Sequence, residues 1–251
     1  MTNDRKVILV TGGSRGIGRA VCEAAAANGY AVVFNYRSDA AAAESLRAAI
    51  EDAGGTALAV QADIAEPGAL EALFAAVDQR FGRLDALVNN AGITGRASPF
   101  MDSEPETIER VMRVNVLALF EACRAGIARM ALSRGGRGGS IVNLSSGAAQ
   151  TGSPNTYVWY GASKAAVDAF SKGLATELAG DGIRVNVVAP GITDTDIHTT
   201  GGRTLDREQL ARAIPMGRMG TPAEVASAIL FLISEAASYI TGANLRVGGG
   251  R

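Results

Sequence analysis

Short runs of β-branched residues alternate along the 251-residue chain with longer alanine-rich segments. Short continuous apolar runs are typical of strands buried on both faces, and longer amphipathic stretches are typical of helices. The pattern predicts seven strands, at residues 6–11, 31–36, 57–63, 86–90, 139–146, 183–190 and 243–247. It predicts helices at residues 16–28, 39–53, 67–81, 104–132, 156–179 and 221–233.

Several residues mark where these helices begin. Thr221-Pro222 suits a helix start, because proline fits the first helical turn. Pro67 predicts the start of another helix for the same reason. Ser103, Glu104, Pro105 and Glu106 have the spacing of a capping box, which predicts that a long helix begins at residue 104.

Regular alternation of strands and helices implies parallel strands joined by right-handed crossovers. The predicted fold class is α/β, a doubly wound Rossmann-type three-layer sandwich with a seven-stranded parallel sheet. We expect one catalytic domain over residues 1–251, since no linker or repeat interrupts the pattern. The one long excursion is residues 192–218. Because it follows a strand end, where open α/β sheets bind ligands, we predict that it is a substrate loop.

Composition narrows the function classes. The net charge is −1 with acidic and basic residues interspersed, so we expect neither a nucleic-acid nor a membrane partner. No apolar run reaches the roughly 18–20 residues that span a bilayer. The two cysteines, Cys22 and Cys123, lack metal-ligand spacing and predict reduced thiols in a cytoplasmic protein. With His198 as the single histidine, we expect no metal site and no histidine-dependent triad.

The segment VTGGSRGIG (10–18) joins the first predicted strand to the first helix. Gly12, Gly16 and Gly18 would allow a tight turn and close approach of the backbone to a pyrophosphate. The helix N-terminus adds free N–H groups and a partial positive charge. No Gly-Lys-Ser/Thr sequence follows, which excludes a Walker loop. The loop therefore predicts dinucleotide binding.

The end of the second predicted strand indicates which dinucleotide is bound. Folds that prefer NAD usually place an acid here to accept from the ribose 2′-hydroxyl. Residues 35–38 are instead Asn, Tyr, Arg and Ser, and Arg15 lies in the glycine loop. Two guanidinium groups favour a 2′-phosphate, which predicts NADP, with NAD possible. Asp39 is expected to belong to the following helix start.

A tyrosine and a lysine four residues apart stand in a predicted helix. Tyr160 and Lys164 would share one helix face. A free phenol has a pKa of about 10, and a nearby cation favours the phenolate. Only three of the 24 basic residues are lysines, and a compact ammonium suits this task better than a guanidinium. Tyr157 does not fit, because Gly161 stands four residues after it.

Together, the glycine loop, the Tyr–Lys pair and the strand order resemble the short-chain dehydrogenase/reductase family over nearly the whole chain. The shared motifs appear in order as TGGSRGIG (11–18), ADI (62–64), NNAG (89–92), Asn115 in VNVLALF, SS (145–146), YGASK (160–164), PGITDT (190–195) and ITGANLRVGGG (240–250). The opening and closing segments are most similar to 3-oxoacyl-(acyl carrier protein) reductases and bacterial glucose 1-dehydrogenases.

The resemblance implies a role for each matching residue. Tyr160 would be the general acid in reduction or the base in oxidation, and Lys164 would lower its pKa and bind the ribose. Ser146 would bond the substrate oxygen, and Asn115 would support a proton relay. Asp63 would approach the adenine. The cofactor-binding residues implied are Gly12, Ser14, Arg15, Gly16, Ile17, Gly18, Arg37, Ser38, Asp63, Ile64, Asn90, Ala91, Gly92, Tyr160, Lys164, Pro190, Ile192 and Thr195.

The interval between Ser146 and Tyr160 is one residue longer than is usual in the family. Counting back from Tyr160 by the usual interval reaches Gly147, whereas counting along the strand IVNLSS reaches Ser146. Adjacent side chains of a strand point to opposite faces, so only one serine should face the nicotinamide. We predict Ser146, with the extra residue in loop 149–156, and Ser145 is the alternative.

The leading hypothesis is an NADP-dependent oxidoreductase that transfers a hydride between the nicotinamide and a small-molecule carbonyl or secondary alcohol. A sugar dehydrogenase of the glucose 1-dehydrogenase kind differs only in substrate. A nucleotide-sensing protein without turnover is a third hypothesis, although it would have no need of the phenol. The resemblance also implies a homotetramer built on the helices at 104–132 and 156–179.

Overall fold

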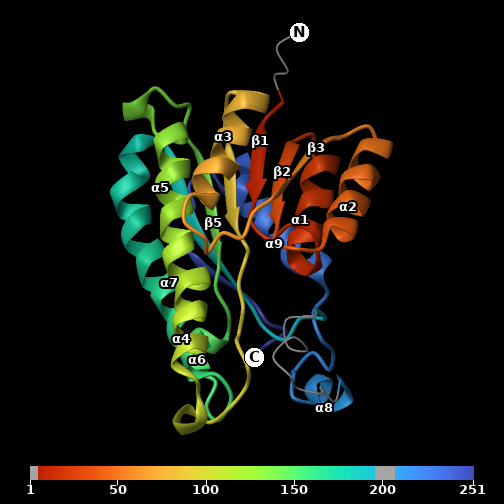
Figure 1. Ribbon diagram of the computed structural model, residues 1–251, viewed down its shortest axis with the longest axis vertical. Coiled ribbons are helices and arrows are strands. Elements are labelled where there is room, and N and C mark those ends of the chain that lie inside the picture. Colours follow the sequence, from red (N-terminus) through yellow and green to blue (C-terminus); the bar gives the residue numbers. More distant parts are fainter. Residues whose placement is uncertain (1–4, 196–206) are drawn as a thin grey trace.

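The computed structural model describes residues 5–195 and 207–251. Their strands form one parallel sheet in the order β3-β2-β1-β4-β5-β6-β7 (Figure 1). The strands are Val7–Val10 (β1), Ala31–Tyr36 (β2), Thr56–Gln61 (β3), Ala86–Asn89 (β4), Gly139–Leu144 (β5), Ile183–Pro190 (β6) and Asn244–Val247 (β7). The predicted seven-stranded parallel sheet is confirmed, and the strand order reverses between β1 and β4, where such folds bind dinucleotides.

Helices cover both faces of the sheet and make three layers (Figure 1). One face packs on α1 (Gly16–Ala27), α2 (Ala40–Asp52) and α9 (Pro222–Ile233). The other packs on α3 (Ala69–Phe81), α5 (Ala118–Met130) and α7 (Val158–Leu178). Side chains of β1 alternate between the two faces of the sheet, so the strand contributes to both hydrophobic cores. Ile8 and Val10 pack against the first helix layer, and Val7 and Leu9 pack against the second.

Not all predicted helix starts are correct. The start at Thr221 is confirmed, because its hydroxyl accepts from the Glu224 backbone and Glu224 bonds back. The capping box at Ser103 is wrong. The Ser103 hydroxyl donates to the Phe100 carbonyl, and α4 (Pro105–Met112) begins without a side-chain cap. Helix α3 begins two residues after Pro67, behind a glycine in the left-handed conformation.

The predicted helix at 104–132 is not uniform. Between α4 and α5 lies a π-helical turn, Arg113–Leu117 (η2). A π turn holds one extra residue and is common at functional sites. Here it contains Asn115, one of the expected catalytic residues.

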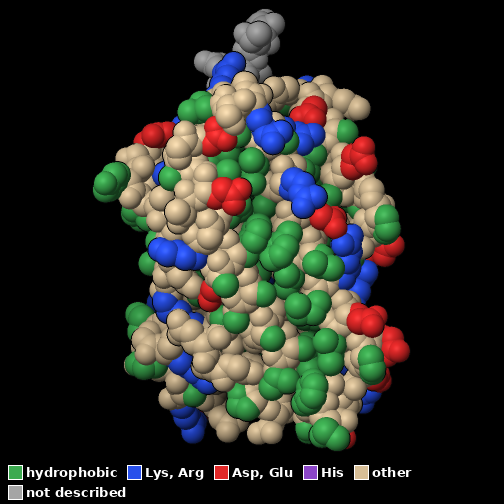
Figure 2. All heavy atoms as spheres, turned by 90° about the vertical axis from the view of Figure 1, so that its left-hand side faces the viewer, with side chains coloured by type: hydrophobic (Ala, Val, Ile, Leu, Met, Phe, Trp, Pro, Cys, Tyr) green, Lys and Arg blue, Asp and Glu red, His purple; other side chains and the backbone are tan. Residues whose placement is uncertain are grey.

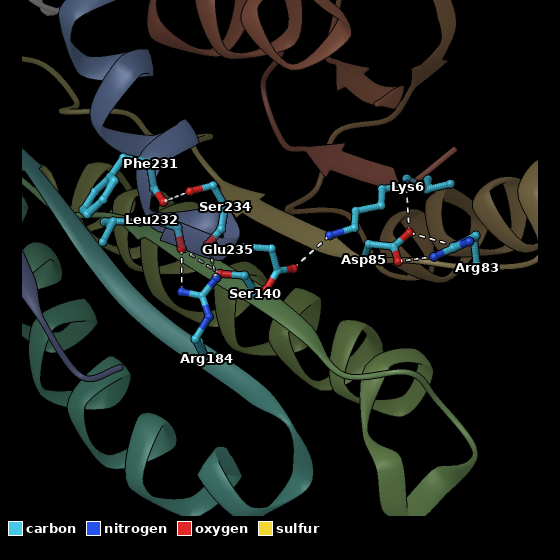
Figure 3. A network of polar contacts seen from close by, with 10 residues as sticks. Lys6, Arg83, Asp85, Ser140, Arg184, Phe231, Leu232, Ser234 and Glu235 are labelled. Atoms are coloured by element: carbon cyan, nitrogen blue, oxygen red, sulfur yellow. Dashed lines mark hydrogen bonds and ion pairs between the residues drawn. The ribbon is translucent and has the colours of Figure 1, made fainter. Parts of the chain in front are cut away.

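Ion pairs and hydrogen bonds join segments at the amino ends of the strands (Figure 3). Lys6 pairs with Glu235 at 3.0 Å, and Arg83 pairs with Asp85, which also accepts from the backbone of β1. Arg184 donates to backbone carbonyls at the end of α9. A shallow hollow of about 510 Å³ opens here, next to Lys6 and Glu235. The predicted site residues follow the opposite, carboxyl ends of the strands, so this hollow is not their site.

Candidate active site

The turn between β1 and α1 presents backbone N–H groups at the carboxyl edge of the sheet. Gly12 and Gly16 have φ of 64° and 54°, a left-handed conformation that favours glycine. A Cβ at Gly18 would lie 2.2 Å from the Gly12 carbonyl oxygen, so a larger residue would push α1 away from the turn. Arg15 at the helix start makes no side-chain cap, which leaves the first-turn N–H groups for an anion.

Two asparagines hold this glycine turn in place. Asn35 at the end of β2 accepts from the Gly12 N–H at 2.9 Å and donates to the Ala62 carbonyl at 2.8 Å. Asn90 donates to the carbonyls of Thr11 and Gly12, both at 2.9 Å. Asn35 is 3% exposed. It is therefore a support of the turn rather than a group directed at a ribose.

The two arginines expected to bind a 2′-phosphate are exposed at this corner. Within residues 5–195 and 207–251, neither Arg15 nor Arg37 makes an ion pair, and Ser38 is exposed next to Arg37. Asp39 is the N-cap of α2 and accepts from the Ala42 N–H at 2.9 Å, which confirms its expected place. No acid is therefore directed against the two guanidinium groups from the end of β2.

Asp63 and Ile64 follow β3, on the adenine side of the expected cofactor cleft. Asp63 is held by the Arg110 guanidinium of α4 and accepts from the Ala65 N–H at 3.1 Å. Ile64 is 6% exposed and belongs to the hydrophobic core. The Arg110–Asp63 pair was not predicted, because nothing in the spacing of two residues 47 positions apart indicates it.

Tyr160 and Lys164 lie in the first turns of α7, 7% and 3% exposed. Helix periodicity brings the Lys164 Nζ to 5.8 Å from the centre of the Tyr160 ring. The ammonium donates to the Leu144 carbonyl at the end of β5, at 2.7 Å. The predicted pair is thus brought together, and the lysine also links α7 to the sheet.

Burial decides the proton affinities of both groups. It lowers the pKa of Lys164 to about 8, with the charge of Asp168 opposing that change. It raises the pKa of the Tyr160 phenol, although the hydrogen bond from Ser146 acts in the other direction. Lys164 was expected to lower the pKa of Tyr160, and the net direction of the pKa change in the structure is the reverse. Desolvation of a buried phenolate outweighs the contacts that favour it.

The two serines after β5 contact different groups. The strand ends at Leu144, two residues earlier than predicted. Ser145 donates its hydroxyl to the Lys164 carbonyl at 3.3 Å, whereas the Ser146 hydroxyl accepts from the Ala148 N–H at 3.1 Å and acts on the Tyr160 phenol, whose pKa it lowers. Loop 149–156 contains Ser153 and Asn155 with positive φ, as an irregular connection would. The geometry therefore favours Ser146 over Ser145 beside the phenol.

The residue after Ser146 lies against an arginine from the far strand. A Cβ at Gly147 would lie 2.3 Å from the Arg246 guanidinium, so glycine lets the side chain of β7 reach across to this turn. Arg246 also donates to the Arg251 carbonyl at 2.9 Å. The contact was not expected from the sequence.

Asn115 connects the π turn to the loop after β4 and to α7. Its side-chain oxygen accepts from the Ile93 N–H. Its side-chain NH₂ donates to the Ile93 carbonyl and, at 3.0 Å, to the Ser163 hydroxyl. Both side-chain donors are therefore occupied. Gly92 lies beside this group, because a Cβ there would be 3.4 Å from both the Asn115 oxygen and the Lys164 Nζ.

The segment after β6 returns toward the glycine loop. Pro190 accepts from the Gly147 N–H at 2.9 Å, and Ile192 accepts from the Gly220 N–H at 3.0 Å. The Thr195 methyl would lie 3.4 Å from a Cβ at Gly16, so the predicted nicotinamide segment meets the turn before α1. Residues 196–206 of the predicted substrate loop, with His198, lie outside the described residues. Helix α8 (Arg207–Arg212), which was not predicted, follows them.

Aromatic residues next to Tyr160 were not predicted as part of the site. Tyr157 lies edge-on to the Tyr160 ring, with 6.0 Å between ring centres, and is 6% exposed. Trp159 donates to the Thr94 carbonyl at 2.8 Å. With Val111, Ala148 and Tyr160 they form a separate apolar cluster. The sequence YVWY contains a signal for it, namely aromatic density at a helix start.

Comparison with known proteins assigns the family. The family model described as enoyl-(acyl carrier protein) reductase matches residues 12–251. The chain belongs to the short-chain dehydrogenase/reductase family. The uncharacterized oxidoreductase YgfF of Escherichia coli is 46% identical over 98% of this chain and 99% of its own. A 3-oxoacyl-[acyl-carrier-protein] reductase of Synechocystis is 40% identical over 98% and 96%.

A solved member of the family has the same architecture. A short-chain dehydrogenase from Burkholderia cenocepacia, in complex with NADP, superposes with a TM-score of 0.89 at 36% identity, over 98% of this chain and 97% of its own. The resemblance seen in the sequence is confirmed. As a short-chain dehydrogenase/reductase, the chain is an oxidoreductase that transfers a hydride between a nicotinamide dinucleotide and a carbonyl or alcohol carbon.

Among the described residues, no cluster of three or more His, Cys, Asp or Glu side chains has the geometry to hold a metal ion. No helix in the same part of the chain is both long and apolar enough to cross a membrane.

Proposed function

We propose that this short-chain dehydrogenase/reductase is an NADP(H)-preferring carbonyl reductase, with one catalytic domain over residues 1–251 and Tyr160 as its general acid. The observation behind the proposal is the placement of Lys164 and Ser146 around the Tyr160 side chain: the Lys164 Nζ lies 5.8 Å from the centre of the buried ring, and the Ser146 hydroxyl is close enough to act on the pKa of the phenol. Because burial raises the pKa of Tyr160, the phenol is protonated at neutral pH. That is the form which carbonyl reduction requires.

The residues present fit a bound NADP(H). Gly18 lets α1 approach the turn at Gly12 closely, and the uncapped start of α1 suits a pyrophosphate. Arg15 and Arg37 are free to form bidentate contacts with a 2′-phosphate. NAD(H) is the alternative cofactor. It has no 2′-phosphate, so both guanidinium groups would lack this partner.

The mechanism follows from the contacts around Tyr160. When bound, the nicotinamide ring supplies or accepts the hydride. The substrate oxygen would lie between the Ser146 and Tyr160 hydroxyls, because the serine is close enough to the phenol to lower its pKa. Tyr160 gives its proton to this oxygen, and the Lys164 ammonium stabilises the phenolate that remains. Asn115 fixes the start of α7 through Ser163.

Steady-state assays with a matched variant test this proposal. We expect oxidation of NADPH with an acetoacetyl thioester or a small ketone, and little reduction of NADP with glucose. Tyr160→Phe should keep cofactor affinity and lower turnover by about 10²–10⁴-fold. Turnover of glucose alone would favour the sugar dehydrogenase. Cofactor binding without turnover of any carbonyl or alcohol would favour the nucleotide-sensing protein.

We also propose a homotetramer in the cytoplasm. Figure 2 shows hydrophobic side chains gathered along the face that η2, α5 and α7 form. Leu117 is 47% exposed there, and Phe120 stacks on Phe170 with 3.9 Å between ring centres. The buried, unpaired thiols of Cys22 and Cys123 suit a reducing compartment. Light scattering at micromolar concentration should give four times the chain mass, and a monomer would contradict the proposal.

A further inference from the structure

Asp168 lies one helical turn after Lys164 on α7. Side chains four residues apart on a helix are neighbours, with about 5–6 Å between Cβ atoms. Asp168 faces the sheet, because it lines a cavity together with Val187 of β6 and Asn244 of β7. Its Oδ1 atom is buried, and no group among the described residues donates a hydrogen bond to it. A buried carboxylate oxygen without a donor is costly, so its retention calls for a reason.

No cation in the described residues pairs with Asp168. The cavity of about 220 Å³ is also lined by Lys172, one turn further along α7, but Lys172 is exposed and forms no ion pair. Ser171 donates its hydroxyl to the Val167 carbonyl. Arg246, two residues after Asn244 on β7, is directed instead at Gly147. Asp168 is therefore a negative charge without a partner on its own side of the cavity.

Lys164, in turn, is a positive charge that forms no ion pair with a carboxylate of the described residues. It is 3% exposed, and it donates a hydrogen bond to the neutral Leu144 carbonyl. The Tyr160 ring and the Asn115 side-chain oxygen, which lies with it beside Gly92, are neutral too. Among the described residues, Asp168 is the one carboxylate whose charge raises the pKa of the ammonium.

We propose that Asp168 is a positioning residue that keeps the Lys164 ammonium charged inside the protein. The two residues share one face of α7, and each lacks another partner of opposite charge in the described structure. Asp168 acts on Tyr160 only through Lys164. The catalytic significance rests on the proposed function, whereas the electrostatic coupling itself does not.

The three lysines of the chain make the coupling directly measurable. With ¹³C-labelled lysine, three side-chain Cε signals should appear, and Lys6→Arg and Lys172→Arg variants assign them. We expect the Lys164 signal of the wild-type protein to titrate with a pKa of about 8. In Asp168→Asn it should titrate about one pH unit lower, because an opposite charge at this spacing has been removed. Asp168→Glu should restore most of the difference.

A matched control and a second neutral variant complete the test. Glu177 is an exposed acid further along α7, so Glu177→Gln should leave the Lys164 titration unchanged. Asp168→Ser also removes the carboxylate, so it should lower the Lys164 pKa as Asp168→Asn does, and it decides the question if Asp168→Asn does not fold. A folded Asp168→Asn or Asp168→Ser with the wild-type Lys164 titration would overturn the proposal.

The pH profile of kcat/KM is an independent test. Carbonyl reduction needs charged Lys164, and this charge is lost as the pH rises through its pKa. The alkaline limb of kcat/KM should therefore move to lower pH in Asp168→Asn, with KM for the cofactor changed less than kcat. If no substrate is turned over at all, the proposed function fails, while the lysine spectra still report on the coupling.

Discussion

Lys164→Met should make the protein more stable near neutral pH while removing its catalytic cation. The Lys164 pKa is about 8 in the folded protein and 10.5 in the reference state. At pH 7 the lysine is charged in both states, and the folded state must keep a desolvated ammonium. Each pH unit between the two values corresponds to about 1.4 kcal/mol, so burial of this charge costs about 3 kcal/mol.

Methionine has a similar length and no charge, so it should fill the same space. The substitution also removes the hydrogen bond to the Leu144 carbonyl, at a cost of about 1 kcal/mol. The net gain in the free energy of unfolding at pH 7 is then about 2 kcal/mol, or an increase in Tm of about 4–8 °C for a chain of this size.

The pH dependence of the stability difference between the variant and the wild-type protein is a more specific test. Between pH 8 and 10.5 the unfolded state binds a proton at this lysine and the folded state does not, so wild-type stability rises with pH relative to the variant. Urea unfolding at several pH values should show the advantage of Lys164→Met shrinking above pH 8 and reversing at about pH 10. Lys172→Met, at an exposed lysine of the same helix, should show no such trend. A variant that is less stable than wild type at pH 7, or whose stability difference is constant with pH, would refute the reasoning.

Three further predictions concern the cofactor and the substrate oxygen. Arg37→Asp should invert the ratio of kcat/KM for NADP(H) over NAD(H), and a ratio that stays above one would remove Arg37 from phosphate recognition. Ser146→Ala should reduce kcat by about 10²-fold or more and Ser145→Ala much less, since the Ser146 hydroxyl acts on the pKa of the phenol whereas the Ser145 hydroxyl bonds the Lys164 carbonyl; steady-state kinetics with the opposite ranking would assign the role to Ser145. Gly18→Ala should abolish detectable cofactor binding by calorimetry, because its methyl group would meet the Gly12 carbonyl at 2.2 Å, and normal affinity would show that the turn can shift without loss.

Local sequence signals were sufficient for the architecture. All seven strands were predicted, because buried β-branched runs separated by helices leave few other parallel arrangements. The Thr221 cap was predictable since its partner Glu224 stands three residues away. The capping box at Ser103 failed for a tertiary reason. The preceding turn at Phe100 takes the serine hydroxyl, and the spacing of residues cannot show that competition.

The site was predictable where motifs are local and unpredictable where they are not. Tyr160 and Lys164 are four residues apart, so helix geometry alone brings them together. The role of Asn35 as a support of Gly12, and the upward change in the Tyr160 pKa, depend on burial and on contacts between distant segments. The π turn around Asn115 has no sequence signature that separates it from an ordinary helix.

The contact of Arg246 with Gly147 has a practical consequence for handling the protein. Residues added after Arg251 would start beside the side chain that supports the serine turn, since Arg246 bonds the Arg251 carbonyl. Residues added before β1 would leave from the opposite edge of the sheet (Figure 1). An affinity tag or an immobilisation linker is therefore better placed ahead of the first strand, where surface attachment leaves the reaction centre open to substrate.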